Sequence, residues 1–304
     1  RRGGNIMAKR NRGYQIMINA VMLLVVVTVV VPFLLLFMSS ITDENTLLVN
    51  GYSFFPEKFS LGAYAYIFRS GDKIFRAYGM TVLVTLLGTL VNVTLSALFA
   101  YPLSLKNLPG KRGITFFVFF TMLFNGGLVP SYILWSNYIG VKDSIWGLLL
   151  PGLLMSAMNV LLIRTYFSTS IPDTLFEAAE IDGAGQMTIF AKIVLPLGKP
   201  ILVTIGTFSG LAYWNDWTNG LYYITKRTEL FTIQNLLNQM VSDLQFLSQN
   251  AGNVSSDVAL ELSKVPSTGV QMAIAFVAIL PIILIFPFLQ KYYAKGIALG
   301  AVKG

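Results

Sequence analysis

Between two long apolar segments the chain reads Ile171-Pro172-Asp173-Thr174-Leu175-Phe176-Glu177-Ala178-Ala179-Glu180-Ile181-Asp182-Gly183-Ala184-Gly185, and it runs on to Ile193-Val194-Leu195-Pro196. Four acidic side chains fall within ten positions of this insert. A loop that only joined two membrane helices would need no ordered helix of its own. The stretch therefore predicts a folded element that a partner grips.

The insert reads as helix, turn and helix. Pro172 suits the first position of a helix, where its missing N–H has no cost, and Asp173 lies near the positive end of the helix dipole. Gly183 fits a helix C-terminus that needs a left-handed residue. We expect a second helix from Gln186 onward that Pro196 halts.

The composition is that of an integral membrane protein. Hydrophobic residues make up 55% of the 304 positions and charged residues only 12%, about half the charge of a typical soluble domain. A helix needs roughly 20 apolar residues to cross a bilayer core of about 30 Å. Six segments qualify, at about 16–38, 78–101, 114–135, 145–167, 199–219 and 269–289. The third contains Asn125-Gly126-Gly127, so we expect it to bend and to face protein.

Basic residues set the orientation of these spans. Fourteen of the 22 Lys and Arg residues lie in the arm 1–15, the loop 102–113, the segment 164–199 and the tail 290–304. By the positive-inside rule, this side and both termini are cytoplasmic. The net charge of +8 thus reflects membrane topology. The basic arm is typical of a lipid-surface anchor rather than of a nucleic-acid site.

The sequence lacks the usual parts of an enzyme or a carrier. It contains no His and no Cys, so we expect no catalytic residue and no metal site. Asp216 is the only acid within a predicted span, whereas ion-coupled carriers need embedded relays. No Walker A pattern occurs. A membrane enzyme or a secondary carrier is therefore disfavoured, and energy for transport must come from another chain.

The spacing within the insert is E-A-A-x-x-x-G, nine residues, then I-x-L-P. It resembles, without a gap, the coupling-loop signature of ABC importer permeases. The resemblance implies an all-α type I permease fold, with six transmembrane helices and a cytoplasmic coupling helix that sits in a cleft of an ATPase. The coupling positions that it implies are Glu177, Ala178, Ala179, Asp182, Gly183, Ile193, Leu195 and Pro196.

Three further stretches are similar to the carbohydrate branch of that family. They are Phe124-Asn125-Gly126-Gly127-Leu128-Val129-Pro130, Tyr213-Trp214-Asn215-Asp216-Trp217, and the tail from Gln290-Lys291-Tyr292-Tyr293 to Gly300-Ala301-Val302-Lys303-Gly304. This resemblance implies import of oligosaccharides or polysaccharide fragments. The alternative is an ABC permease for another solute, such as a peptide or a polyamine.

The resemblance also implies a set of partners in a bacterial cell membrane. They are a second, homologous permease, two ATP-binding subunits that hold ATP and Mg²⁺, and an extracytoplasmic sugar-binding protein. This chain itself would hold no cofactor. In relatives with a similar tail, the tail can reach the ATPase dimer, which implicates Gly300, Val302 and Lys303. The alternative interpretation is a disordered terminus.

A sugar path needs aromatic faces with amide or hydroxyl groups. The residues that offer this chemistry in the spans are Tyr213, Trp214, Asn215, Trp217, Asn92, Asn125 and Asn159. For each Asn, hydrogen bonding between helices is the stronger interpretation. For the aromatic cluster, an interfacial belt competes evenly with a role in the path.

The long outward segment 220–267 contains one clear pattern. Leu and Ile residues recur at three- and four-residue steps from Leu230 to Leu247, which predicts an amphipathic helix. Such a helix could lie on the membrane or cap the translocation mouth. Packing against the outer rim of the bundle is an equally good interpretation.

Overall fold

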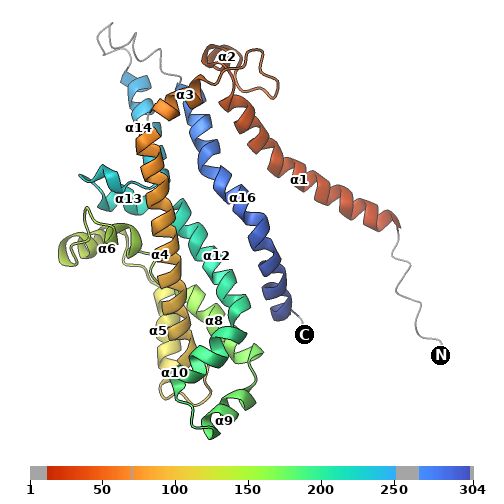
Figure 1. Ribbon diagram of the computed structural model, residues 1–304, viewed down its shortest axis with the longest axis vertical. Coiled ribbons are helices and arrows are strands. Elements are labelled where there is room, and N and C mark those ends of the chain that lie inside the picture. Colours follow the sequence, from red (N-terminus) through yellow and green to blue (C-terminus); the bar gives the residue numbers. More distant parts are fainter. Residues whose placement is uncertain (1–11, 70, 251–266, 302–304) are drawn as a thin grey trace. The chain divides into compact units, whose positions relative to one another are not determined.

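The computed structural model describes residues 12–69, 71–250 and 267–301, which form helices joined by short loops (Figure 1). Within these ranges no strand forms, and one isolated bridge pairs Thr42 with Phe59. The chain divides into two compact units, one with the residues up to Gly71 and Met240–Leu280, the other with Asp72–Gln239 and Pro281–Gly304. The fold class is all-α, as the composition predicts.

The first unit contains α1 (Arg12–Ser40), α2 (Glu44–Asn50), α3 (Gly62–Arg69) and the beginning of α16 (Ser267–Ala301). Most side chains of α1 are apolar and exposed, as expected for a span that faces lipid or another chain. The carboxylate of Glu44 accepts hydrogen bonds from the N–H groups of Thr268 (2.9 Å) and Gly269 (2.8 Å). Because these groups belong to the first turn of α16, the carboxylate satisfies donors that the helix leaves unpaired.

Besides the end of α16 from Pro281 onward, the second unit contains the elements from α4 to the start of α14. They are α4 (Gly71–Ser104), α5 (Lys111–Leu123), α6 (Leu128–Ile133), η1 (Leu134–Tyr138), α7 (Trp146–Leu149), α8 (Ala157–Ser170), α9 (Asp173–Ile181), α10 (Gln186–Ile189), η2 (Phe190–Val194), α11 (Leu195–Leu197), α12 (Lys199–Asn215), α13 (Thr218–Tyr223), η3 (Thr228–Leu230) and α14 (Ile233–Asn250). Figure 1 shows α9 and α10 at one end of this unit, beside the ends of α5 and α8.

The third predicted span breaks where the glycines lie. α5 and the α6–η1 segment meet at 110°, and Gly127 between them has φ +88°, a backbone conformation that glycine adopts without steric cost. The Asn125 side chain accepts a hydrogen bond from the Gly127 N–H at 2.9 Å. The expected bend is present, and it is sharp enough to turn residues 128–138 away from the axis of α5.

The fourth predicted span, 145–167, is not one helix. α7 ends at Leu149 and α8 begins at Ala157, because Pro151 removes a backbone donor and Gly152 adopts φ +72°. A side chain of α4 stabilises the non-helical segment between α7 and α8, because the Asn92 amide donates a hydrogen bond to the Leu153 carbonyl at 2.7 Å. Hydropathy alone does not distinguish this broken segment from a continuous span.

The remaining spans lie close to their predicted ranges. α1, α4 and α16 contain the first, second and sixth, while α12 ends four residues before the predicted end of the fifth. In the described part of the chain, three helices are long and apolar enough to cross a membrane. Two bent pairs, at residues 111–138 and 186–214, raise the number to five if each pair is one span. The amphipathic helix predicted in segment 220–267 is α14.

The largest buried cluster supports the end of the second unit that carries α9. It joins the C-terminal half of α4 to α8 and to the α10–η2 segment through side chains such as Tyr101, Ile163, Phe167, Ile189 and Val194. Each is at most 6% exposed. Burying a side chain of this size stabilises the fold by about 1.5–3 kcal/mol relative to exposure, so these elements form one firmly packed body.

Candidate functional site

Helix α9 and the turn after it are built as their sequence predicts, with one difference. α9 begins at Asp173, and Pro172 precedes it as the N-cap residue rather than as the first helical one. Gly183 adopts φ +75°. The Ala184 N–H then donates to the Ala179 carbonyl at 2.9 Å, and the Gly183 N–H donates to the Glu180 carbonyl at 3.0 Å. These bonds satisfy the last carbonyls of α9, which fixes its C-terminus.

One face of α9 packs on the buried cluster. Phe176 and Ala179 are half-buried against it. The ring centroid of Tyr101, at the end of α4, lies 6.5 Å from that of Phe176 and 5.3 Å from that of Phe190, distances typical of favourable aromatic pairs. α9 is thereby attached to α4 and to the π-helical turn η2 at once.

Polar contacts strengthen this attachment. The Tyr101 hydroxyl donates to Gln186 Oε1 at 2.6 Å, and Gln186 Nε2 donates to Glu180 Oε1 at 3.0 Å. Lys106 Nζ lies 2.5 Å from Asp173 Oδ2, and this hydrogen bond and charge raise the pKa of Lys106. The contacts surround a cavity of about 350 Å³ between the loop after α4 and α9. They connect both ends of α9 to its support.

The face of α9 that carries Ala178 and Ile181 is open. Glu177 and Ala178 are exposed, with Glu177 at the edge of the cavity. Glu177 makes no hydrogen bond or ion pair with a residue that the structure describes, although after Asp173 its charge also helps to raise the pKa of Lys106. Bulky apolar side chains beside them are also exposed, including Ile181 at 85% and Met187 at 68%. An exposed apolar patch beside an exposed carboxylate, on a well-supported helix, is typical of a protein interaction surface.

The second half of the insert corrects the prediction that Pro196 halts a helix begun at Gln186. The chain runs through α10, the π-turn η2 and α11, and Pro196 lies within α11. The direction changes by 79° at Gly198, before α12. A side chain there would overlap the ring of Phe167 and the Val194 carbonyl, so close packing against α8 places the bend. Of the predicted coupling positions here, Ile193 and Leu195 are half-buried and Pro196 is exposed.

Two of the amides predicted for a sugar path meet inside the unit. Asn92 Oδ1 accepts from the Ser209 hydroxyl at 2.7 Å and from Asn159 Nδ2 at 3.3 Å. Asn92 is 3% exposed and Ser209 5%. These contacts join α4, α8 and α12. For Asn92 and Asn159 they agree with the interpretation that the sequence favoured, which is hydrogen bonding between helices.

The aromatic cluster at the end of α12 divides between buried and exposed positions. Tyr213 is 1% exposed, donates its hydroxyl to the Leu149 carbonyl at 2.9 Å and leaves no room for a side chain at Gly88. Trp214 is also buried, whereas Asn215 and Trp217 are exposed, as is Asn125 in the break of the third span. The structure thus gives Tyr213 a packing role and leaves Asn215, Trp217 and Asn125 accessible.

Comparison with known proteins identifies the chain. The family described as binding-protein-dependent transport system inner membrane component matches residues 3–299. The chain belongs to this family. It is a transport permease, and an inner membrane component of a system that includes a binding protein.

Among curated relatives, the permease is 36% identical over 295 residues to the polygalacturonan/rhamnogalacturonan transport system permease protein YtcP of Bacillus subtilis, with 97% of this chain and all of the relative covered. It is 33% identical to the protein LplC of the same organism over 90% of each chain. Among solved structures, a chain of a bacterial ABC transporter involved in the import of the acidic polysaccharide alginate matches with a TM-score of 0.78 and 28% identity. That match covers 93% of this chain and 98% of the other.

The amide network gives a stability prediction for the permease. Replacing Asn92 with Leu leaves the Leu153 carbonyl, Asn159 and Ser209 without their shared partner, so we expect the free energy of unfolding to fall by about 1 kcal/mol. Unfolding in mixed micelles with increasing denaturing detergent measures it. The control is Thr165→Val, which removes an exposed hydroxyl bonded to its own helix at Leu161 and should change little. Equal stability of the two variants would contradict a structural role for Asn92.

A contact of the loop after η1 was not predicted from the sequence. Asp143, after η1, has φ +50°, and its Oδ1 accepts backbone hydrogen bonds from Thr225 (2.8 Å), Lys226 (2.7 Å) and Arg227 (3.2 Å). These bonds hold the pKa of this carboxyl well below its usual range. No motif surrounds Asp143. Its left-handed backbone, which Asp tolerates better than most residues, is visible only in the structure.

Asp143 predicts an acid-sensitive loop in the permease. Because the folded-state pKa is depressed, the carboxylate stabilises the loop contact above its unfolded pKa of about 3.9, and this contribution is lost as the pH falls below that value. We expect Asp143→Gly, which keeps the backbone conformation, to speed hydrogen exchange at Thr225–Arg227 at pH 7. For Asp143→Asn, which keeps one acceptor oxygen, the exchange rate should lie between those of wild type and the Gly variant. Protection unchanged in the Gly variant would contradict the contact.

Two other expectations concern the ends and metal binding. Gly300 lies in the last turn of α16, while Val302 and Lys303 lie outside the described residues. Among the residues that the structure describes, no group of three or more acidic side chains is arranged to hold a metal ion.

Proposed function

We propose that the chain is the permease subunit of an ATP-driven sugar importer, and that the open face of α9 couples it to an ATPase. The observation that carries the proposal is the placement of the motif itself. Glu177 and Ala178 lie exposed on α9, while Phe176 and Ala179 of the same helix pack on the support. Because some residues of the motif pack on the support while others are exposed, the exposed residues are available to a partner.

The support explains how force would pass through α9. Tyr101 and Gln186 connect it to α4, and the packed bend at Gly198 connects it to α12. Because packed interiors transmit displacement rather than absorb it, ATPase closure would move α9 and the helices together. Chemistry would reside in the two partner ATP-binding subunits, which hold ATP and Mg²⁺, so this chain is proposed not to be an enzyme.

The sugar assignment rests on relatives named for polygalacturonan/rhamnogalacturonan, for melibiose/raffinose/stachyose and for alginate. The path would form between this chain and a second homologous permease, with an extracytoplasmic binding protein delivering the sugar. Asn215, Trp217 and Asn125 have the exposure that contact with a sugar requires. The path would be supported by side chains that pack or form hydrogen bonds within the unit, namely Asn92, Asn159, Tyr213 and Trp214.

The proposed topology places both termini in the cytoplasm of a bacterial cell. It follows from the basic residues of the arm and tail and puts α9 on the same side as the ATPase. Gly300, Val302 and Lys303 at the end of the chain would then lie within reach of the ATPase subunits. No nucleic acid is involved.

Reconstitution tests the proposal. The permease is combined with its second permease, the ATP-binding subunits and the binding protein in proteoliposomes, and ATP-dependent uptake of a labelled oligosaccharide is measured. We expect uptake that unlabelled sugar competes for and that peptides and polyamines do not. Uptake of a peptide or polyamine without uptake of sugar would contradict the assignment.

A further inference from the structure

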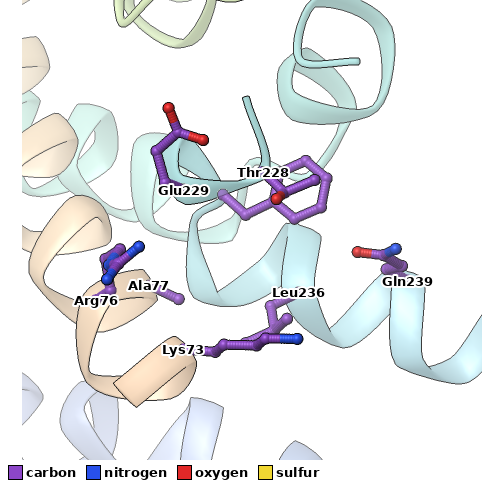
Figure 2. A pocket seen from close by; sticks show the side chains of 8 residues that line it. Lys73, Arg76, Ala77, Thr228, Glu229, Leu236 and Gln239 are labelled. Carbon is purple, nitrogen blue, oxygen red and sulfur yellow. The ribbon is translucent and has the colours of Figure 1, made fainter. Parts of the chain in front are cut away.

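A basic pocket lies at the outward end of the second unit, away from α9. It has a volume of about 290 Å³ and forms where the first turns of α4 face η3 and the start of α14. Figure 2 shows Lys73 and Arg76 entering from α4, with Thr228, Glu229 and Gln239 on the opposite wall. Under the proposed topology this pocket opens outside the cell.

The two cations are placed where an anion would be favourable. Lys73 and Arg76 are three residues apart, so they share one face of α4, and both are exposed. Neither forms a hydrogen bond or ion pair with a residue within the described ranges. The pKa of Glu229 is lowered mainly by its hydrogen bond to Arg227, and the charge of Arg76 adds a smaller contribution. They also lie in the first two turns of α4, near the positive end of its dipole, where cations are unfavourable unless an anion compensates.

Two other cations that the proposed topology places outside the cell are engaged with neighbours. Lys58 lies 3.6 Å from Asp43, and Lys142 lies over the ring of Tyr132 at 4.9 Å. Glu229, the acid of the pocket wall, is bonded to Arg227 at 2.8 Å. In Figure 2 its carboxylate points away from the Lys73 ammonium group. The pocket therefore keeps a net positive charge.

The uncharged part of the wall suits a sugar. Thr228 offers a hydroxyl, Gln239 offers an amide that both donates and accepts, and Phe231 offers an aromatic ring. Hydroxyl and amide groups match sugar hydroxyls, and an aromatic ring packs against the apolar face of a sugar ring. A few placed polar groups beside an apolar surface are the usual composition of a small-molecule site.

We propose that this pocket binds the carboxylate of a uronic acid unit in the incoming oligosaccharide, with Lys73 and Arg76 as its cationic partners. The inference rests on the proposed sugar import and names the substrate class as acidic sugars. It is consistent with relatives whose names specify polygalacturonan and the acidic polysaccharide alginate. In this chain the assignment is carried by the two cations, which have no hydrogen bond or ion pair in the described ranges, and by the polar wall opposite them.

Sugar binding to the assembled transporter tests the proposal directly. The complete complex in nanodiscs, without the binding protein, is titrated with trigalacturonic acid by calorimetry. We expect the double variant Lys73→Gln, Arg76→Gln to raise the Kd about tenfold and to reduce its dependence on salt, because two exposed charge pairs are lost. The methyl ester of the same trisaccharide should bind wild type and variant alike.

Two matched variants separate charge from fold. Lys142→Gln removes an outward cation that does not line the pocket and should leave the Kd unchanged. Lys73→Arg keeps the charge and should retain most of the affinity. An unchanged Kd in the double variant would overturn the inference.

The result distinguishes this inference from the proposed function. Loss of affinity for the binding protein alone, with sugar affinity intact, would overturn the inference and assign the pocket to a carboxylate of that protein. An importer that carries neutral and acidic sugars with equal affinity would contradict only the acidic-sugar inference. Absence of sugar uptake in every reconstitution would instead contradict the proposed function.

Discussion

Replacing Glu177 with Lys is expected to lower transport and binding-protein-stimulated ATP hydrolysis about thirtyfold. Glu177 is exposed on α9 beside Ala178 and lacks a hydrogen bond within the described structure, so its carboxylate is available to a basic group of the ATPase. Reversing a charge that becomes buried at an interface costs roughly 2 kcal/mol or more, which corresponds to that factor. Initial rates in proteoliposomes measure the effect.

The same substitution should leave the permease itself folded. The Glu177 side chain is exposed and is not part of the buried cluster, and its charge acts only on the exposed Lys106. The thermal unfolding temperature in detergent should therefore fall only slightly. Glu177→Gln, which removes the charge without reversing it, should show a smaller loss. If Glu177→Lys assembles and transports normally, the coupling role of this helix is wrong.

Replacing Gly198 with Ala should damage the link between the α9 segment and α12. The new methyl group would lie 2.5 Å from a ring carbon of Phe167 and 2.8 Å from the Val194 carbonyl oxygen. Phe167 is 1% exposed and cannot swing aside, so the backbone at the 79° bend must shift. Overpacking of this kind costs about 1–3 kcal/mol, and we expect both a lower unfolding temperature and weaker ATPase stimulation.

Two other glycines of the segment are internal controls. Gly185 has open space around it and φ −70°, so Gly185→Ala should be neutral or slightly stabilising. Gly183 also has open space, but its φ of +75° should make Gly183→Ala cost about 1–2 kcal/mol through the backbone alone. Comparable unfolding temperatures for the Ala variants at 185 and 198 would contradict the packing explanation.

Local signals were predictable from the sequence. The end of α9 at Gly183 and the break at Gly127 each depend on a glycine and its neighbours, so they can be read from a short stretch of residues. The long apolar helices α1, α4 and α16 follow from composition in the same way. The family resemblance rested on fixed spacings, which also lie within one segment.

Contacts between distant segments were not predictable. The interruption between α7 and α8 is held by Asn92, about sixty residues earlier in the chain, and hydropathy does not record such a bond. Pro196 was expected to end a helix, but the π-turn before it shifts the hydrogen-bond pattern so that the chain continues to Gly198. Asp143 was missed because its partners lie some eighty residues away.

The candidate path illustrates the same limit. Tyr213 and Trp217 are four residues apart, and from the sequence both were equally good candidates for contact with a sugar. In the structure, however, Tyr213 is 1% exposed and Trp217 is 44% exposed. Residue type predicted the chemistry of these side chains. Only the packing of α12 against Gly88 and Leu149 decides which of them is accessible.

The absence of cysteine from the chain permits one decisive measurement of where α9 docks. Ala178→Cys introduces a single thiol on the open face of α9, and Lys142→Cys introduces one on the loop after η1, which the proposed topology places outside the cell, as the control. Each assembled transporter, with an otherwise cysteine-free background, is treated with a short thiol-to-amine cross-linker. We expect position 178 to cross-link to the ATP-binding subunit, with a yield that changes on adding ATP, and position 142 not to. Failure of position 178 to reach that subunit in an active complex would contradict the central claim that α9 is the coupling element.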